Sequence, residues 1–214
     1  MDAIVSVENS EIENTDWLAE WKKHWKPTTI GRFVIAPPWA DIEAADKIMI
    51  RIEPNMAFGT GTHETTQLCI NAIDELYHPG DSFLDVGTGT GILAIAAAKL
   101  VNGESDFLGI DNDPDSVKIA MENAESNGVS FIEFALETLN PELRPFDFVC
   151  ANLTIAVILP MLKDLLTKTR KTLVMSGILA EQEPLIVEAL AKQNVENPHI
   201  DRQGEWISVT VVKA

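Results

Sequence analysis

Stretches with the hydrophobic spacing of a helix alternate with short apolar runs along this chain of 214 residues. From His63 to Tyr77, Leu68, Ala72 and Leu76 form an apolar stripe at helical spacing. Further helical stretches alternate with short apolar runs that are typical of buried strands. The predicted strands cover residues 82–87, 106–111, 130–134, 146–152 and 171–177, and the predicted helices cover 63–77, 92–100, 114–127, a stretch from 153 and 183–192. This alternation predicts an α/β fold in which right-handed crossovers join parallel strands and helices cover both faces of the sheet.

Residues that start, stop or bend helices refine this prediction. Asp113 precedes Pro114 and is expected to cap the helix that begins there, and Gly128 is expected to terminate it. Pro160 should kink the helical stretch that starts near Leu153, because proline removes a backbone hydrogen bond.

The two ends of the chain depart from the regular alternation. Trp17, Trp21 and Trp25 recur at helical spacing, and residues 47–53 alternate like a strand with one buried face. We therefore expect residues 1–54 to contribute a linker helix and N-terminal strands, and residues 55–214 to form the main domain.

The C-terminal run, residues 205–213, alternates Ile207, Val209 and Val211 with small or polar residues. No helical stretch separates this run from the turn expected at residues 201–204. The end of the chain is therefore predicted to form a hairpin with one antiparallel strand.

Composition and charge restrict the kinds of partner. The chain has 33 acidic and 16 basic residues, a formal charge of -17, so that non-specific binding to nucleic-acid phosphates is not expected. A positively charged partner fits better, and the charge could equally serve solubility alone. Neither Cys69 nor Cys150 belongs to a metal-binding or CxxC pattern, so both are expected to be buried free thiols in a reducing compartment.

The sequence also indicates a location and argues against a metal site. The acidic start lacks the features of a secretory signal, and the longest apolar run, residues 92–98, is too short to span a bilayer. We therefore expect a cytoplasmic protein without membrane contact. The four histidines show no ligand spacing, and no metal is expected.

Two similar Gly-Thr segments suggest a binding site: AFGTGTHETT at residues 57–66 and DVGTGTG at residues 85–91. The second places its glycines between a strand and a helix, where a ligand can approach the backbone at the helix N-terminus. Such turns also occur for close packing alone, so this loop by itself is a weak indication. A dinucleotide fingerprint would need a glycine at the position of Ile92, which argues against NAD.

Acidic residues around this loop strengthen the case for a nucleotide-like ligand. Asp111 lies about 20 residues beyond the loop, where an acid accepts hydrogen bonds from ribose hydroxyls. Asp113 is assigned to the helix cap instead. Asp85 could accept hydrogen bonds from the turn or face the ligand through water.

These motifs resemble those of a known family. DVGTGTGIL at residues 85–93 and GIDND at residues 109–113 resemble the S-adenosylmethionine-dependent methyltransferases of the Rossmann-like class. NMAFGTGTHETT at residues 55–66, ANLTI at 151–155, SGIL at 176–179 and Glu205-Trp206 resemble the ribosomal protein L11 methyltransferases. The resemblance implies a mostly parallel seven-stranded sheet, S-adenosyl-L-methionine as the cofactor, and N-methylation of lysine or N-terminal amines of that large-subunit ribosomal protein.

The resemblance also implies which residues bind the cofactor between the two Gly-Thr segments. The implied contacts are Thr66, Gly87, Asp111 and Asn152, with Phe58, Gly59 and Thr60 as weaker candidates. Gly89 and Asp85 are further candidates from the glycine loop itself. His63 could belong to the site or simply begin a helix, for which Thr62 is an alternative N-cap.

Asn152 is the candidate catalytic residue, as an acceptor that orients the attacking amine. Its alternative role is to cap the helix that follows. Methyltransferases of nucleic-acid amines usually resemble Asn-Pro-Pro-aromatic here, whereas Leu153 and Thr154 follow in this chain.

One departure from the family concerns the first residues. The family usually carries a small substrate-recruiting domain ahead of the tryptophan-rich helix, and only about fifteen residues precede that helix here. We expect a catalytic fragment that binds the cofactor normally and methylates its protein substrate poorly. A small-molecule methyltransferase of the same fold and a non-catalytic module that binds an adenosine ligand remain alternatives. The sequence leaves open which amines are modified, how often, and whether the chain self-associates.

Overall fold

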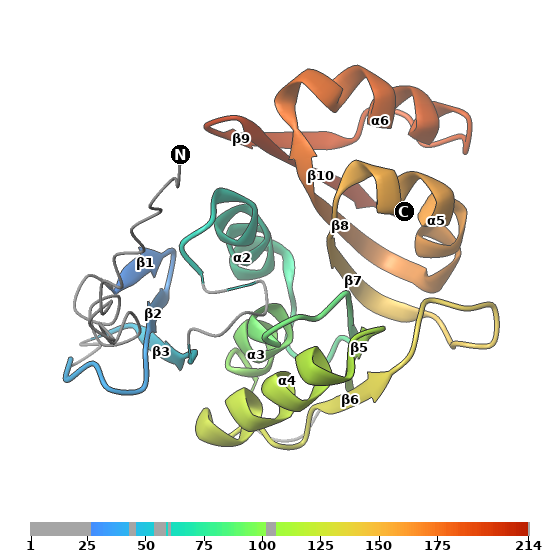
Figure 1. The fold of residues 1–214 in the computed structure, drawn as a ribbon. Helices are drawn as coiled ribbons and strands as arrows, with labels where there is room; N and C mark the ends of the chain where they lie inside the picture. The colour runs from blue at the N-terminus through green and yellow to red at the C-terminus, as the bar shows by residue number, and fades with distance from the viewer. Residues whose placement is uncertain (1–26, 43–45, 54–58, 60, 102–105, 214) are drawn as a thin grey trace, which may run out of the picture.

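The computed structural model describes residues 27–42, 46–53, 59, 61–101 and 106–213 (Figure 1). The helix predicted from Trp17, Trp21 and Trp25 lies outside the described residues, as do the site candidates Phe58 and Thr60.

A seven-stranded sheet forms the centre of the fold, in the order β6-β5-β4-β7-β8-β10-β9. Its strands are β4 (Phe83–Val86), β5 (Phe107–Asp111), β6 (Glu133–Leu136), β7 (Phe146–Asn152), β8 (Thr169–Leu179), β9 (His199–Gln203) and β10 (Trp206–Val212). The five strands from β4 to β8 pair in parallel, and β10 pairs antiparallel with both β8 and β9. The predicted fold class, with a single reversed strand near the C-terminus, is therefore confirmed.

Helices cover both faces of this sheet, as predicted (Figure 1). They are α2 (Glu64–Leu76), α3 (Ile92–Ala98), α4 (Pro114–Ser126), α5 (Ile155–Lys168) and α6 (Glu183–Ala191). Phe83 and Phe148 point to the core shared with α2 and α3, whereas their neighbours Leu84 and Val149 point to the core shared with α5 and α6. Adjacent strand residues thus serve opposite faces, because side chains alternate along a strand.

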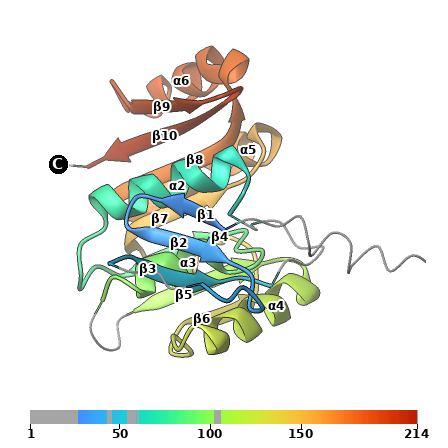
Figure 2. The same ribbon diagram turned by 90° about the vertical axis from the view of Figure 1, so that its left-hand side faces the viewer.

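A separate three-stranded sheet packs beside α2 and α3 (Figure 2). It contains β1 (Thr28–Ile30), β2 (Phe33–Ala36) and β3 (Ile48–Arg51), the last of which is the strand predicted at residues 47–53. Phe33 and Ile50 are buried in the same core as α2 and α3. This sheet is therefore packed directly onto the main fold.

Several predicted boundaries need correction. The strand predicted at residues 130–134 forms only from Glu133, because the amide of Ile132 bonds the carbonyl of Val129 in a turn. The turn predicted at residues 201–204 is wrong: β9 extends to Gln203, because even its exposed polar residues pair through their backbones with β10.

The predicted helix signals are otherwise found where expected. Asp113 caps α4 by accepting a hydrogen bond from the amide of Asp115, and Gly128 follows the helix in a left-handed conformation. Pro160 lies inside α5, which continues through it to Lys168, and the kink expected there stays a prediction. Both cysteines are buried and free, as predicted.

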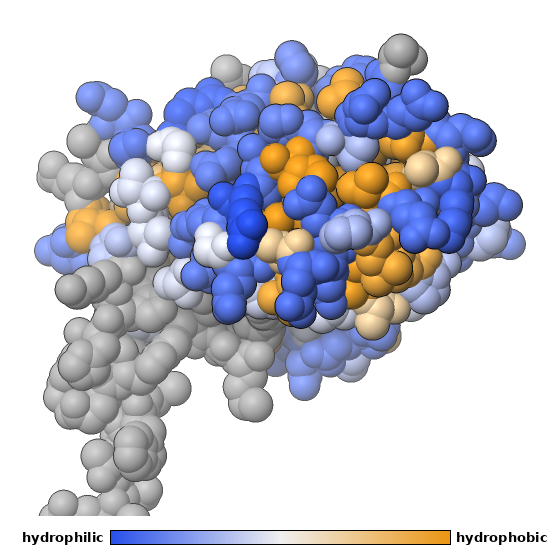
Figure 3. All heavy atoms as spheres, turned by 90° about the horizontal axis from the view of Figure 1, so that it is seen from above, coloured by the Kyte–Doolittle hydropathy of each residue, from blue (hydrophilic) through white to orange (hydrophobic). Residues whose placement is uncertain are grey.

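The surface above α6 and β9 is mostly hydrophilic, with hydrophobic side chains interspersed among the polar ones (Figure 3). Within the part of the chain that the structure describes, no helix is both long enough and apolar enough to cross a membrane.

Candidate cofactor-binding site

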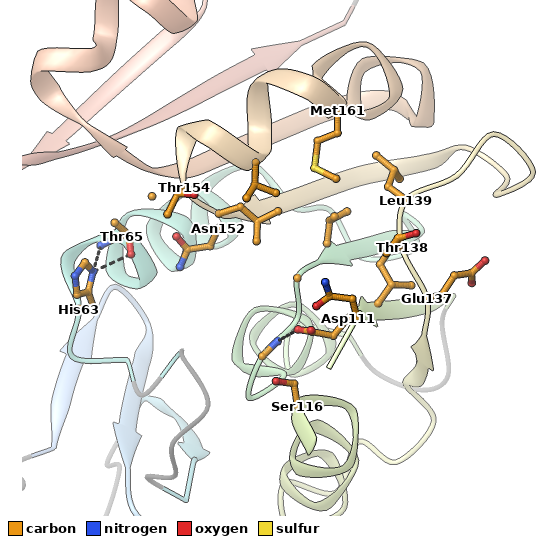
Figure 4. A pocket seen from close by; sticks show the side chains of 18 of the residues that line it. His63, Thr65, Asp111, Ser116, Glu137, Thr138, Leu139, Asn152, Thr154 and Met161 are labelled. Atoms are coloured by element: carbon orange, nitrogen blue, oxygen red, sulfur yellow. Dashed lines mark hydrogen bonds between the residues drawn. The ribbon is translucent and has the colours of Figure 1, made fainter. Parts of the chain in front are cut away.

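A cavity of about 450 Å³ opens at the carboxyl ends of β4, β5 and β7 (Figure 4). The chain runs outward from β4 to β5 and β6 and then returns to β7 on the other side of β4. Open α/β sheets bind ligands at such a switch point, and the volume falls within the range of small-molecule sites. The lining residues are His63, Thr65, Val86, Gly87, Gly89, Ile110, Asp111, Asn112, Ser116, Glu137, Thr138, Leu139, Asn152, Leu153, Thr154, Val157, Met161, Gly177 and Trp206.

Asp111 joins the glycine loop to the end of β5. One of its carboxylate oxygens accepts a hydrogen bond from the amide of Gly89 at 2.9 Å, and the other accepts one from the amide of Asp113 at 3.0 Å. Each carboxylate oxygen can accept a second hydrogen bond. Asp111 therefore fixes the loop and can still accept hydrogen bonds from ligand hydroxyls.

Asn152 projects from the end of β7 onto the cavity wall (Figure 4). Its amide nitrogen donates a long hydrogen bond of 3.4 Å to the hydroxyl of Thr66 in α2. Its amide oxygen is buried and has no hydrogen-bond partner among the described residues. The alternative role of Asn152 as a helix cap is wrong, because Thr154 occupies the N-cap position of α5.

His63 occupies the N-cap position of α2, so the alternative assignment of Thr62 as the cap is wrong. The Nδ1 atom of His63 accepts a hydrogen bond from the amide of Thr65 at 3.3 Å. The imidazole also packs edge-on against Trp206, with 5.0 Å between ring centroids. His63 and Trp206 therefore form one aromatic side of the cavity.

Three predicted site residues lie behind the cavity wall. Thr66 is fully buried and contacts Asn152. Gly59, in the first Gly-Thr segment, accepts a hydrogen bond from Thr90 of the glycine loop, and Asp85 is buried below that loop. The hydroxyl of Thr88 donates to the Asp85 carboxylate at 2.8 Å, which is the turn contact considered from the sequence. Gly87, Gly89, Asp111 and Asn152 themselves line the cavity.

Burial raises the pKa of Asp85 to about 7, although hydrogen bonds from the Thr88 side chain and the Ala94 backbone partly offset this. An unfolded aspartate titrates near 3.9. Between about pH 4 and pH 7 the folded protein therefore holds a proton that the unfolded chain has lost, and stability decreases as the pH rises through this window.

We predict that Asp85→Asn removes this pH dependence. The amide has the same shape, can still accept the Thr88 hydrogen bond and carries no charge. The difference in free energy of unfolding between the variant and the parent protein should shift in favour of the variant by on the order of 4 kcal/mol as the pH rises from 4 to 8. Urea denaturation at several pH values measures this difference, and parallel stability curves for the two proteins would contradict the prediction.

Several cavity residues were not predicted as site residues. Glu137, Thr138 and Leu139 come from the segment after β6, and Val157 and Met161 come from α5. Trp206 belongs to a motif noted in the sequence, but nothing in its spacing indicated a place in the cavity. The apolar side chains make one part of the wall suitable for a non-polar portion of a ligand.

No group of three or more potential metal-ligating His, Cys, Asp or Glu residues occurs within the described parts of the chain. The cavity wall consists of backbone groups, the carboxylates of Asp111 and Glu137, amides and hydroxyls, and apolar or aromatic side chains.

The strand order, the glycine-rich loop after β4 and the acid at the end of β5 define a Rossmann-like methyltransferase fold. The chain belongs to the ribosomal protein L11 methyltransferase (PrmA) family, whose model matches residues 2–214.

Individual relatives agree with this assignment. A ribosomal protein L11 methyltransferase from Geobacter sulfurreducens is 44% identical over 202 residues, which are 91% of this chain and 65% of that protein. One from Caldicellulosiruptor bescii is 39% identical over 95% of this chain and 67% of its own length. The chain thus spans about two thirds of the length of these curated relatives.

Solved structures agree as well. The crystal structure of a ribosomal protein L11 methylase from Lactobacillus delbrueckii subsp. bulgaricus matches with a TM-score of 0.76 and 32% identity, covering 85% of this chain and 95% of that one. Magnesium protoporphyrin IX methyltransferase from Synechocystis, solved with bound SAM, shares the fold at a TM-score of 0.55 and 15% identity, covering 76% of this chain and 86% of that one.

Proposed function

We propose that this chain binds S-adenosyl-L-methionine in the cavity and transfers its methyl group to lysine or N-terminal amines of ribosomal protein L11. The family to which the chain belongs is named for this substrate. The observation that carries the proposal is that Asn152 lines the cavity and that its buried amide oxygen has no hydrogen-bond partner among the described residues. A buried polar atom without a partner is costly unless a ligand completes its hydrogen bonding.

The residues present fit an adenosyl sulfonium compound. The carboxylate of Asp111 can accept hydrogen bonds from ribose hydroxyls, and Gly87 and Gly89 let a ligand approach the loop backbone. Leu139, Val157 and Met161 supply the apolar surface that an adenine ring or an aliphatic chain requires. When bound, the cofactor supplies an electrophilic methyl group for in-line transfer.

The protein's task is then to present a neutral amine in the correct orientation. A lysine with a pKa near 10.4 is neutral in about one molecule in a thousand at pH 7.4, which corresponds to roughly 4 kcal/mol. Apolar surroundings lower the pKa of a lysine, so Leu153 and the other apolar wall residues favour the reactive form. The amide oxygen of Asn152 can accept an N–H of that amine and direct its lone pair.

The charge of the chain fits a basic protein substrate. A formal charge of -17 favours encounter with a lysine-rich surface and makes the association rate sensitive to salt. The same charge disfavours nucleic acid as a partner.

Transfer of a labelled methyl group from S-adenosyl-L-methionine to purified ribosomal protein L11 tests the proposal. Label should appear on amines of the protein, and mass spectrometry should locate them on lysine or N-terminal groups. Calorimetry with the same cofactor is the control for binding. Cofactor binding without any transfer to the ribosomal protein would contradict the proposed substrate, and no binding would contradict the proposed function as a whole.

A further inference from the structure

The two Gly-Thr segments of the sequence are joined directly by a hydrogen bond. The hydroxyl of Thr90, in the glycine loop, donates to the carbonyl oxygen of Gly59, in the first segment, at 2.6 Å. Thr90 is completely buried, and it does not line the cavity in the part of the chain that the structure describes. This bond therefore lies behind the proposed cofactor site.

The backbone at Gly59 lies so close to the glycine loop that only glycine fits there. Gly59 has a φ of 109°, which side-chain-bearing residues rarely adopt. A Cβ atom at this position would lie 2.7 Å from the hydroxyl oxygen of Thr90 and 3.3 Å from a methyl carbon of Ile92. The backbone at Gly59 therefore lies directly against the side chain of Thr90.

Thr90 is itself held from other directions. Its carbonyl oxygen accepts a hydrogen bond of 2.9 Å from the buried side-chain amide of Asn123 in α4. The preceding residue, Gly89, donates its amide to Asp111. Thr90 is therefore a fixed anchor to which the first segment is attached.

Residues 61–66, which follow Gly59 closely in the sequence, lead into the cavity wall. His63 follows Gly59 by four positions and caps α2. The first turn of α2 places Thr65 on the cavity wall and Thr66 against Asn152. A displacement of Gly59 would therefore be transmitted to residues that shape the site.

We propose that the hydrogen bond from Thr90 to Gly59 positions the start of α2 against the cavity, which makes Thr90 a positioning residue for cofactor binding. This inference rests on the proposed function, because it assumes that the cavity holds the cofactor. The competing explanation is that the hydroxyl only satisfies a buried carbonyl and contributes to stability without affecting the site.

Thr90→Val tests the bond, because valine keeps the shape and removes the hydroxyl. Thr90→Ser restores the hydroxyl and serves as the rescue. Thr169→Val is the matched control, since the buried hydroxyl of Thr169 also donates to a backbone carbonyl, that of Leu165, and Thr169 does not line the cavity among the described residues. For each protein, calorimetry gives the Kd for S-adenosyl-L-methionine, thermal unfolding gives the stability, and hydrogen exchange without cofactor reports on the segment from Gly59 to His63.

We expect Thr90→Val to raise the Kd by about tenfold or more, because the Gly59 carbonyl loses its partner and the segment loses its attachment. Exchange in the segment from Gly59 to His63 should become faster while exchange in β7 stays unchanged. Thr90→Ser should stay within about threefold of the parent Kd, and Thr169→Val should lower stability without changing the Kd.

The outcomes separate the inference from the proposed function. If the parent protein binds the cofactor and Thr90→Val binds it equally well, the inference is overturned and the proposed function stands. If Thr90→Ser binds the cofactor as weakly as Thr90→Val, the loss of affinity comes from altered packing and not from the hydrogen bond, which also overturns the inference. If the parent protein binds no cofactor, the proposed function fails, and unchanged exchange in Thr90→Val would independently refute the attachment.

Discussion

Replacement of Asn152 by alanine is expected to lower kcat for methyl transfer by about 100- to 1000-fold. The substitution removes the buried amide oxygen that we assign to orienting the attacking amine. Because the fold does not depend on this oxygen, the protein should remain folded, with a stability loss of about 1 kcal/mol from the lost contact with Thr66. Single-turnover methyl transfer measures the chemical step, and the Kd for the cofactor measures binding separately.

Thr66→Val provides a graded comparison for this prediction. It removes the hydroxyl to which the Asn152 amide nitrogen donates and leaves the amide oxygen in place. A loss of about tenfold is expected, because the amide is then less firmly oriented. A chemical step in Asn152→Ala as fast as in the parent protein would exclude the assigned role.

Gly87→Ala is expected to destabilise the fold by about 2–4 kcal/mol and to weaken cofactor binding by at least about tenfold. Gly87 has a φ of 72°, and a Cβ atom there would lie 2.5 Å from a methyl carbon of Leu153. Leu153 lines the cavity, so its displacement changes the shape of the site. Urea denaturation measures the stability and calorimetry measures the binding.

Two further variants separate the causes of this effect. Gly80 has a φ of 101° and no heavy atom within 4 Å of its ideal Cβ position, so Gly80→Ala reports backbone strain alone, at about 1–2 kcal/mol. In a Leu153→Ala background the added methyl group of Gly87→Ala has more room, and its cost should fall by about 1 kcal/mol. An equal cost of Gly87→Ala in both backgrounds would show that Leu153 is not the obstacle.

Much of the fold could be predicted because its pattern is local. Apolar runs such as residues 82–87 can form strands only if both faces are covered, and the helical stripe with Leu68 needs a sheet to pack against. Boundaries were less certain where no hydrophobic pattern exists. The polar residues of β9 pair through backbone groups, which leave no trace in the residue types.

The site could be predicted only in part, because a cavity depends on contacts between distant segments. Asp111 and the glycine loop were recognisable because Asp111 ends β5, the loop follows β4, and the two strands end at the same edge of the sheet. The bond between Asn152 and Thr66 joins positions 86 residues apart, and no local pattern encodes it. The same is true of Trp206, which meets His63 only because β10 pairs with β8 beside α2.

A crystal structure of the chain with S-adenosyl-L-homocysteine, the demethylated cofactor, tests the central claim most directly. The account predicts that the ribose hydroxyls lie within hydrogen-bond distance of the Asp111 carboxylate. It also predicts that the ligand contacts the loop backbone at Gly87 and Gly89 and that the sulfur of the ligand faces Asn152. A ligand bound elsewhere on the protein, or bound in the cavity without contact to Asp111 and Asn152, would contradict it.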